Sequence, residues 1–178
     1  MIERAHPLQP QAADAAQCAA VSLASAPALT RIAVRAGGAA AIAIGDRLGV
    51  ALPAVPFRIT EHRGRFALWL GPDEWLVLAN EGTELPSTHA AGSIVDVSHA
   101  LTGIIMMGSR AAWAINAFCA LDLHPSAFPV GMCTRTAFAK AQIVLWRTAT
   151  DTFRIEVARS FAPYVWDCLE EARREFLP

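Results

Sequence analysis

Apolar and polar positions in the first half of this chain follow two periods, one after the other. Residues 31–35 alternate with the period of two that is typical of a β-strand. The Ala-rich segment 38–48 predicts a helix, and Gly49 lies just beyond its end. Residues 66–70 and 75–79 then flank a Gly-Pro-Asp-Glu connector of the hairpin type. The pattern therefore predicts a strand, a helix and a pair of strands.

The second half repeats this order of elements. It predicts two strands, a helix, a further pair of strands and a C-terminal amphipathic helix, over residues 94–98, 103–107, 110–121, 136–146, 152–157 and 161–176. Residues 31–53 align with residues 103–125 without a gap, and a proline ends both segments. Such a repeat indicates an internal duplication. We therefore expect an α+β fold of two tandem ferredoxin-like units, with antiparallel sheets and helices on one face.

The expected boundaries follow from this repeat. Residues 1–28 lack a stable period, and three prolines bracket their Ala-rich segment, so we interpret them as an N-terminal arm. Residues 29–90 are the first expected α+β unit, and residues 91–178 are the second. Because repeated units bury a continuous core when they stack, we expect the two to pack as one domain.

The composition bears on the possible partners. Hydrophobic residues make up 54% of the chain and charged residues only 17%, against roughly 25% in a typical soluble domain. This excess of hydrophobic over charged residues indicates either a large core or a surface that faces another protein. The formal net charge is -1 and Lys140 is the only lysine, so the clustered cations of a nucleic-acid-binding protein are missing. No apolar stretch approaches the roughly 20 residues of a membrane-spanning helix.

The cysteines favour a reducing compartment. The four of them lie far apart without a C-x-x-C pair, and the N-terminus does not match a secretion signal, so we expect free thiols and a cytoplasmic protein. Cys119, His124 and Cys133 share one region of the chain, but their spacing matches no usual zinc site. Cys119 also falls on the apolar side of its expected helix, where a cysteine is typically a small buried residue.

Asp96, Ser98 and His99 contain the residue types of a hydrolytic triad. In a strand, however, Asp96 and Ser98 point to one face and His99 to the other. A triad needs side chains that converge from different parts of the chain, together with an oxyanion hole. The glycines that precede the two expected helices belong to no nucleotide-binding motif. We therefore predict no catalytic, cofactor-binding or metal-binding residue in this chain.

Three segments resemble known families. Residues 95–99, with the apolar strand and helix that follow them, resemble the start of the glycine-cleavage T-protein family of aminomethyltransferases, which has a folate-binding fold. The segment Leu70–Leu78, which reads LGPDEWLVL, more specifically resembles the gamma subunits of heterotetrameric sarcosine oxidases. Residues 134–148 are similar to the same subunits, and the resemblance extends over about residues 29–175.

This resemblance implies a complex that demethylates sarcosine to glycine with oxygen. In that family FAD, FMN, NAD and tetrahydrofolate are held by partner subunits. The gamma subunit packs on the folate-binding region of the alpha subunit, and beta and delta subunits complete the complex. The resemblance thus implies a non-catalytic, stabilising subunit without a cofactor of its own.

The chain differs from the T-protein family and its folate-associated relatives at two motifs, and both differences fit a non-catalytic role. T-proteins carry a pair of aspartates where this chain reads approximately Lys140-Ala141, and neither side chain can replace a carboxylate that relays a proton. A Lys-Gly-Cys-Tyr motif of other folate-associated relatives has only the partial match Val130–Cys133. A freestanding folate-binding protein of the same fold, and a redox or metal enzyme built on the cysteines, remain as alternatives.

Overall fold

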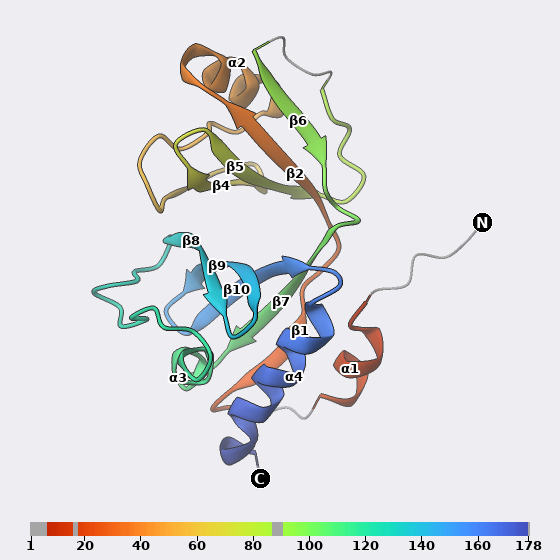
Figure 1. Cartoon of the computed structure of the whole chain (residues 1–178), viewed down its shortest axis with the longest axis vertical. Coiled ribbons are helices and arrows are strands. Elements are labelled where there is room, and N and C mark those ends of the chain that lie inside the picture. The colour runs from red at the N-terminus through yellow and green to blue at the C-terminus, as the bar shows by residue number, and fades with distance from the viewer. Residues whose placement is uncertain (1–6, 16–17, 87–90, 178) are drawn as a thin grey trace, which may run out of the picture. The chain divides into compact units, whose positions relative to one another are not determined.

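The computed structural model describes residues 7–15, 18–86 and 91–177, which form an α+β structure with two five-stranded sheets (Figure 1). One sheet has the order β1-β7-β10-β9-β8, and the other has the order β3-β4-β5-β2-β6. The strands are β1 (Ser22–Ser25), β2 (Leu29–Ala36), β3 (Ile59–His62), β4 (Arg65–Gly71), β5 (Glu74–Asn80), β6 (Gly92–Asp96), β7 (Leu101–Met107), β8 (Cys133–Phe138), β9 (Ala141–Ala149) and β10 (Thr152–Ala158). The helices are α1 (Gln9–Asp14), α2 (Gly38–Leu48), α3 (Ala111–Asn116) and α4 (Ala162–Arg173), followed by the 3-10 turn η1 (Arg174–Phe176). The expected α+β class with antiparallel sheets is confirmed.

The chain divides into two compact units. We call residues 28–101 and 131–134 the β2 unit, and the described residues of 1–27, 102–130 and 135–178 the β7 unit. Among the described residues, no helix has the length and apolar character needed to cross a membrane.

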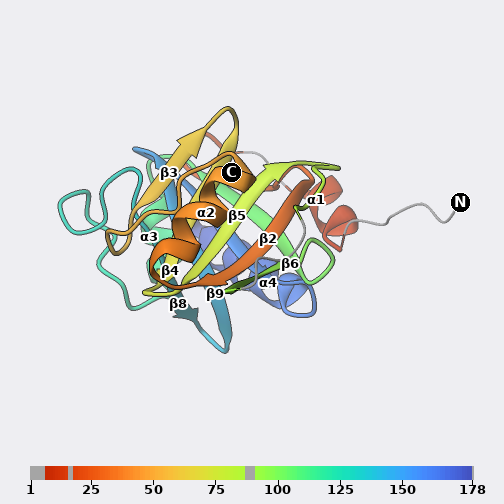
Figure 2. The ribbon, with the colours of Figure 1, turned by 90° about the horizontal axis from the view of Figure 1, so that it is seen from above.

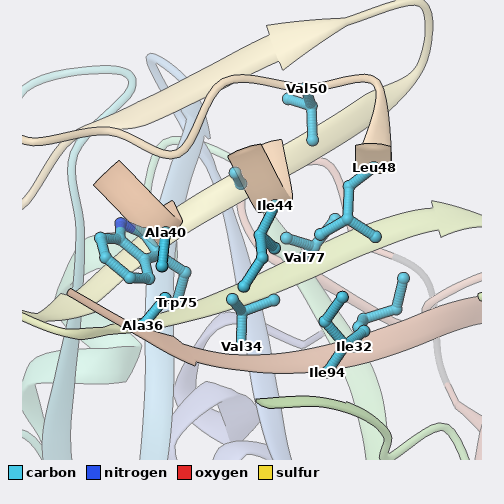
Figure 3. Close-up of a cluster of buried hydrophobic side chains, with 11 residues drawn as sticks. Ile32, Val34, Ala36, Ala40, Ile44, Leu48, Val50, Trp75, Val77 and Ile94 are labelled. Carbon is cyan, nitrogen blue, oxygen red and sulfur yellow. The ribbon is translucent and has the colours of Figure 1, made fainter. Parts of the chain in front are cut away.

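In the β2 unit, α2 covers one face of its sheet (Figure 2). The Ala-rich sequence favours the helix, and Gly49 ends it in the left-handed conformation at φ 67°, which glycine adopts without strain. Ile44 of α2 is fully buried against Val34 of β2 and Val77 of β5 (Figure 3). Trp75 joins this core and donates its indole N–H to the Pro53 carbonyl at 2.8 Å, so the group is both buried and hydrogen-bonded.

In the β7 unit, β10 and α4 both bury apolar side chains. Phe153, Ile155 and Val157 of β10 are buried, but Arg154 and Glu156 on the alternate positions are buried too, where Arg154 donates from Nε to Glu156 at 2.7 Å. Val165 and Leu169 of α4 are also buried, as the helical period predicts. One charged residue of this helix departs from the amphipathic pattern, because Arg173 is fully buried instead of facing solvent. It donates hydrogen bonds from Nε and Nη2 to Glu170 at 2.9 and 2.7 Å, and this pairing compensates for the burial of its charge.

The strand that opens each half belongs to the sheet of the other half. β1 pairs with β7, and β6 pairs with β2, both in antiparallel orientation. The exchange is reciprocal: Ile32 lies opposite Asp96, and Ile104, its counterpart in the duplication, lies opposite Ser25.

This exchange alters the expected boundaries. Within the expected arm, residues 1–28, Leu8, Val21 and Leu23 have no exposed surface, and residues 22–25 are a strand of the β7 unit. The expected start of the second unit at residue 91 also differs, because β6 belongs to the first sheet. A period of two identifies a strand but does not indicate which neighbour it pairs with.

Candidate functional site

Asp96, Ser98 and His99 do not form a catalytic arrangement. The Ser98 hydroxyl accepts the Arg31 backbone N–H at 2.8 Å, and the Asp96 carboxylate accepts the Ser98 N–H at 2.8 Å. Ser98 is buried and His99 is exposed. The two polar side chains therefore extend the pairing of β2 and turn the chain after β6.

The three candidate metal ligands are also separate. Cys119 is a buried residue of the β7 unit, whereas Cys133 belongs to the β2 unit. His124 lies on an exposed loop, where its Nδ1 and the Ser126 Oγ are 2.8 Å apart. No group of three His, Cys, Asp or Glu side chains in the described part of the chain has the geometry of a metal site.

Cys133 is buried, and its surroundings shift the pKa of its thiol. Burial raises the pKa of its thiol from 9.0 to about 12, although a weak hydrogen bond to the Trp69 carbonyl opposes this shift. The Sγ lies 3.6 Å from that carbonyl oxygen and 3.5 Å from the Arg58 carbonyl oxygen. Because the thiolate is the nucleophile, a raised pKa leaves this thiol unreactive near neutral pH.

We therefore expect Cys133 to resist alkylation in the folded chain at pH 8. Iodoacetamide labelling followed by peptide mass spectrometry measures this directly. The same peptide, labelled after unfolding in guanidinium chloride, serves as the control and should be modified fully. Rapid labelling of Cys133 in the folded chain would show that its surroundings do not hold the thiol in its neutral form.

The segments that departed from the folate-associated motifs lie in turns. Lys140 is exposed between β8 and β9, after Ala139, whose φ is 46°. Ala141 is buried at the start of β9. Gly131, at φ 82°, precedes Met132, which pairs with Arg58 in an isolated antiparallel bridge. Neither Lys140 nor Ala141 offers a carboxylate.

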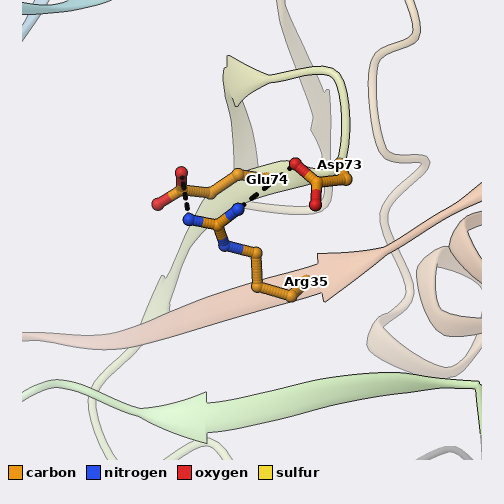
Figure 4. A network of polar contacts seen from close by, with 3 residues as sticks. All are labelled: Arg35, Asp73 and Glu74. Carbon is orange, nitrogen blue, oxygen red and sulfur yellow. Dashed lines mark hydrogen bonds and ion pairs between the residues drawn. The ribbon is translucent and has the colours of Figure 1, made fainter.

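The Gly-Pro-Asp-Glu connector, by contrast, makes a defined polar contact with β2 (Figure 4). Arg35 donates from Nη1 to Asp73 at 3.2 Å, and its Nη2 lies 2.9 Å from the Glu74 carboxylate. The Ala36 N–H also donates to the Asp73 carbonyl at 3.1 Å. Since the Arg35 and Asp73 side chains are more than half exposed, the ion pairs add little stability and mainly fix the hairpin beside β2.

A cavity of about 680 Å³ opens in the β2 unit, and sequence reasoning did not foresee it. The last turn of α2 forms one side, and the β3–β4 hairpin with the end of β5 forms the other. Thr60 donates its hydroxyl to the Ala51 carbonyl, and Arg65 donates from Nη1 to the Leu48 carbonyl. These two bonds attach the hairpin to the end of α2, and the cavity lies between the hairpin and the helix.

The tip of this hairpin carries backbone strain. Arg63 and Gly64 have φ values of 49° and 75°, which form a two-residue turn of the type that favours Asn-Gly or Gly-Gly. A left-handed conformation costs a side-chain-bearing residue other than Asn or Asp about 1 kcal/mol. The Arg-Gly connector between two alternating segments was the available sequence signal for this turn.

The comparisons with known proteins agree with one another. A family model described as "Sarcosine oxidase, gamma subunit family" matches residues 33–175. The sarcosine oxidase subunit gamma of Corynebacterium sp. strain U-96 is 32% identical over 175 residues, which cover 93% of this chain and 85% of that protein. The corresponding subunit of Corynebacterium sp. strain P-1 is 34% identical over 158 residues, covering 83% of this chain and 77% of that one.

Solved structures show the same relationship in three dimensions. A chain of the heterotetrameric sarcosine oxidase from Corynebacterium sp. U-96 has a TM-score of 0.89 at 30% identity, over 97% of this chain and 96% of that one. The glycine cleavage system aminomethyltransferase T from Bartonella henselae has a TM-score of 0.60 at 14% identity, over 85% of this chain and 46% of that one. The second similarity shows a shared fold and nothing about activity.

Proposed function

Because the chain belongs to the sarcosine oxidase gamma subunit family, we propose that it is the gamma subunit of a heterotetrameric sarcosine oxidase, which demethylates sarcosine oxidatively to glycine. The observation that carries this proposal is the similarity of fold to a chain of a solved heterotetramer over nearly the full length of both. We also propose a cytoplasmic location, which the four free cysteines support.

We further propose that this chain is not catalytic. The Ser98 hydroxyl is engaged by a backbone N–H, and Lys140 is exposed in a turn. These observations support a structural role, because neither residue is placed to relay a proton with a second side chain. FAD, FMN, NAD and tetrahydrofolate then belong to the partner subunits.

The proposed partner contact is with the folate-binding region of the alpha subunit, with beta and delta subunits in the same complex. Large apolar side chains that remain exposed support such a contact. In the β2 unit they are Ile42, Val55, Phe57 and Val95, and in the β7 unit they are Met107, Trp113, Val130 and Phe161. Trp is among the residue types that contribute most to binding at protein interfaces, and Phe is enriched there.

Co-expression with the alpha, beta and delta chains tests the proposal. We expect this chain to elute with them in size-exclusion chromatography at micromolar concentrations, and its omission to reduce assembly or sarcosine-dependent oxygen consumption. Within the complete complex, His99→Ala and Lys140→Ala should leave that consumption unchanged, because both side chains are exposed.

Two outcomes would contradict the proposal. Separate elution of this chain, with full oxidase activity in the remaining three, would exclude a role as a subunit. Stoichiometric binding of tetrahydrofolate to the isolated chain would instead favour a freestanding folate-binding protein of the same fold.

A further inference from the structure

The cavity of the β2 unit has opposite charges on its two sides. Asp46 lies on the α2 side, next to the carbonyl groups at the C-terminal end of the helix, which carry partial negative charge. His62, Arg63 and Arg65 lie on the hairpin side. Glu61 is also on that side, where its Oε1 accepts the Gly64 N–H at 3.3 Å, and its negative charge offsets only one of the two arginines. The two sides therefore differ in sign.

These charges do not pair across the cavity. Within residues 7–15, 18–86 and 91–177, neither the Asp46 carboxylate nor the Arg63 guanidinium has a hydrogen-bond or ion-pair partner. The Arg65 guanidinium donates from Nη1 to the Leu48 carbonyl and has no other hydrogen-bond or ion-pair partner in the same part of the chain. Several guanidinium N–H groups and a carboxylate thus remain available around one open volume of about 680 Å³.

The backbone positions the two arginines at some cost. Arg63 is held in a left-handed conformation that glycine or asparagine would adopt with less strain. Arg65 is fixed against the end of α2, and Gly49 leaves the room, because a Cβ there would lie 2.9 Å from Nη1 of Arg65. The Arg65 guanidinium, held in this way, can contact a carboxylate with less loss of side-chain freedom.

The charge pattern selects the class of ligand. A guanidinium favours a carboxylate or a phosphate. The Asp46 carboxylate and the negative end of α2 disfavour a densely charged anion and favour an amine instead. We propose that this cavity binds an elongated zwitterionic molecule, with its carboxylate on Arg63 and its cationic amine toward Asp46. This site goes beyond the proposed role as a subunit and does not depend on it.

Isothermal titration calorimetry of the full-length chain with ε-aminocaproate tests the site. We expect saturable binding that weakens as salt is added, because exposed charges are screened. Caproate and hexylamine each carry one of the two charged groups, and each should bind at least about tenfold more weakly, since one charge-assisted hydrogen bond is lost. Asp46→Asn should weaken binding by a similar factor.

The Arg63→Gly variant distinguishes an effect on ligand binding from an effect on the stability of the fold. It should weaken ε-aminocaproate binding at least about tenfold. Because glycine relieves the strained turn, its urea midpoint of unfolding should equal or exceed that of the unmodified chain. Arg174→Gln makes the same change of charge at an exposed position outside the cavity and should leave binding unchanged.

Four results would each overturn the proposal. They are the absence of saturable ε-aminocaproate binding at millimolar concentrations, equal affinity of the Arg63→Gly chain, equal affinity for caproate, and tighter binding of inorganic phosphate than of ε-aminocaproate. Equal affinity for caproate would remove the role of the amine, and tighter binding of phosphate would assign the site to another class of ligand.

Discussion

Replacement of Leu23 by alanine should lower the free energy of unfolding by about 2–5 kcal/mol, the range for a fully buried leucine. Leu23 has no exposed surface, and it lies in β1 opposite Met106 of β7. Its loss leaves a cavity at the edge of the β7 sheet. The measurement is urea denaturation followed by circular dichroism, with the midpoint and the slope reported together.

Removal of residues 1–28 should have a still larger effect and prevent the β7 unit from folding. The deletion takes away β1 and three side chains without exposed surface, Leu8, Val21 and Leu23. It also removes the acceptor of the Arg110 N–H, which donates to the Ala20 carbonyl at 2.9 Å. Gly108 allows this close approach, because a Cβ there would lie 2.4 Å from the Ala20 oxygen.

Ile42→Ala is the matched control for these variants. Ile42 is 70% exposed on α2, so the removal of its side chain should change the unfolding free energy by no more than about 0.5 kcal/mol. A deletion variant that unfolds cooperatively at the unchanged urea midpoint would show that the N-terminal strand is a dispensable arm.

The sequence predicted the elements of the fold better than their pairing. Residues 31–35 and 103–107 are strands as expected, and the ungapped alignment of the two halves corresponds to β2-α2 and β7-α3. Local alternation is enough to identify such strands. The exchange of β1 and β6 between the sheets could not be predicted from the sequence, because it depends on contacts between residues far apart in the chain. Residues 22–25 are too few to show a period of their own.

The cavity illustrates a different limit. Its charged residues were visible in the sequence as an Arg-rich connector around Arg63, but nothing in their spacing placed Asp46 beside them. Their approach depends on the left-handed Gly49, which ends α2, and on the hydrogen bond from Arg65 to the Leu48 carbonyl. Backbone geometry of this kind is decided by tertiary contacts. The rejection of a triad at Asp96, Ser98 and His99 needed only the alternation of a strand.

Replacement of Arg147 by methionine should destabilise the β7 unit by about 2–5 kcal/mol, because it leaves two buried carbonyl groups without their donor. Arg147 is 3% exposed in β9 and donates from Nη1 to the Leu123 and Phe128 carbonyls at 3.2 and 2.9 Å. Its Nε donates to the Thr150 carbonyl at 2.9 Å, and its guanidinium lies 5.0 Å from the Phe153 ring centroid. Methionine retains much of the side-chain volume but none of these donors.

The local consequence should appear in the loop that Arg147 fastens. Hydrogen exchange of the amides in residues 117–130 should accelerate in this variant, since the segment contains both buried carbonyl acceptors. Arg147→Lys should restore only part of the protection, because an ammonium lacks the planar fork that reaches three carbonyls at once. Arg174→Met is the matched control, with a side chain 72% exposed, and it should change stability by no more than about 0.5 kcal/mol. Unchanged exchange in residues 117–130 of the Arg147→Met chain would mean that apolar packing, rather than this guanidinium, holds the loop.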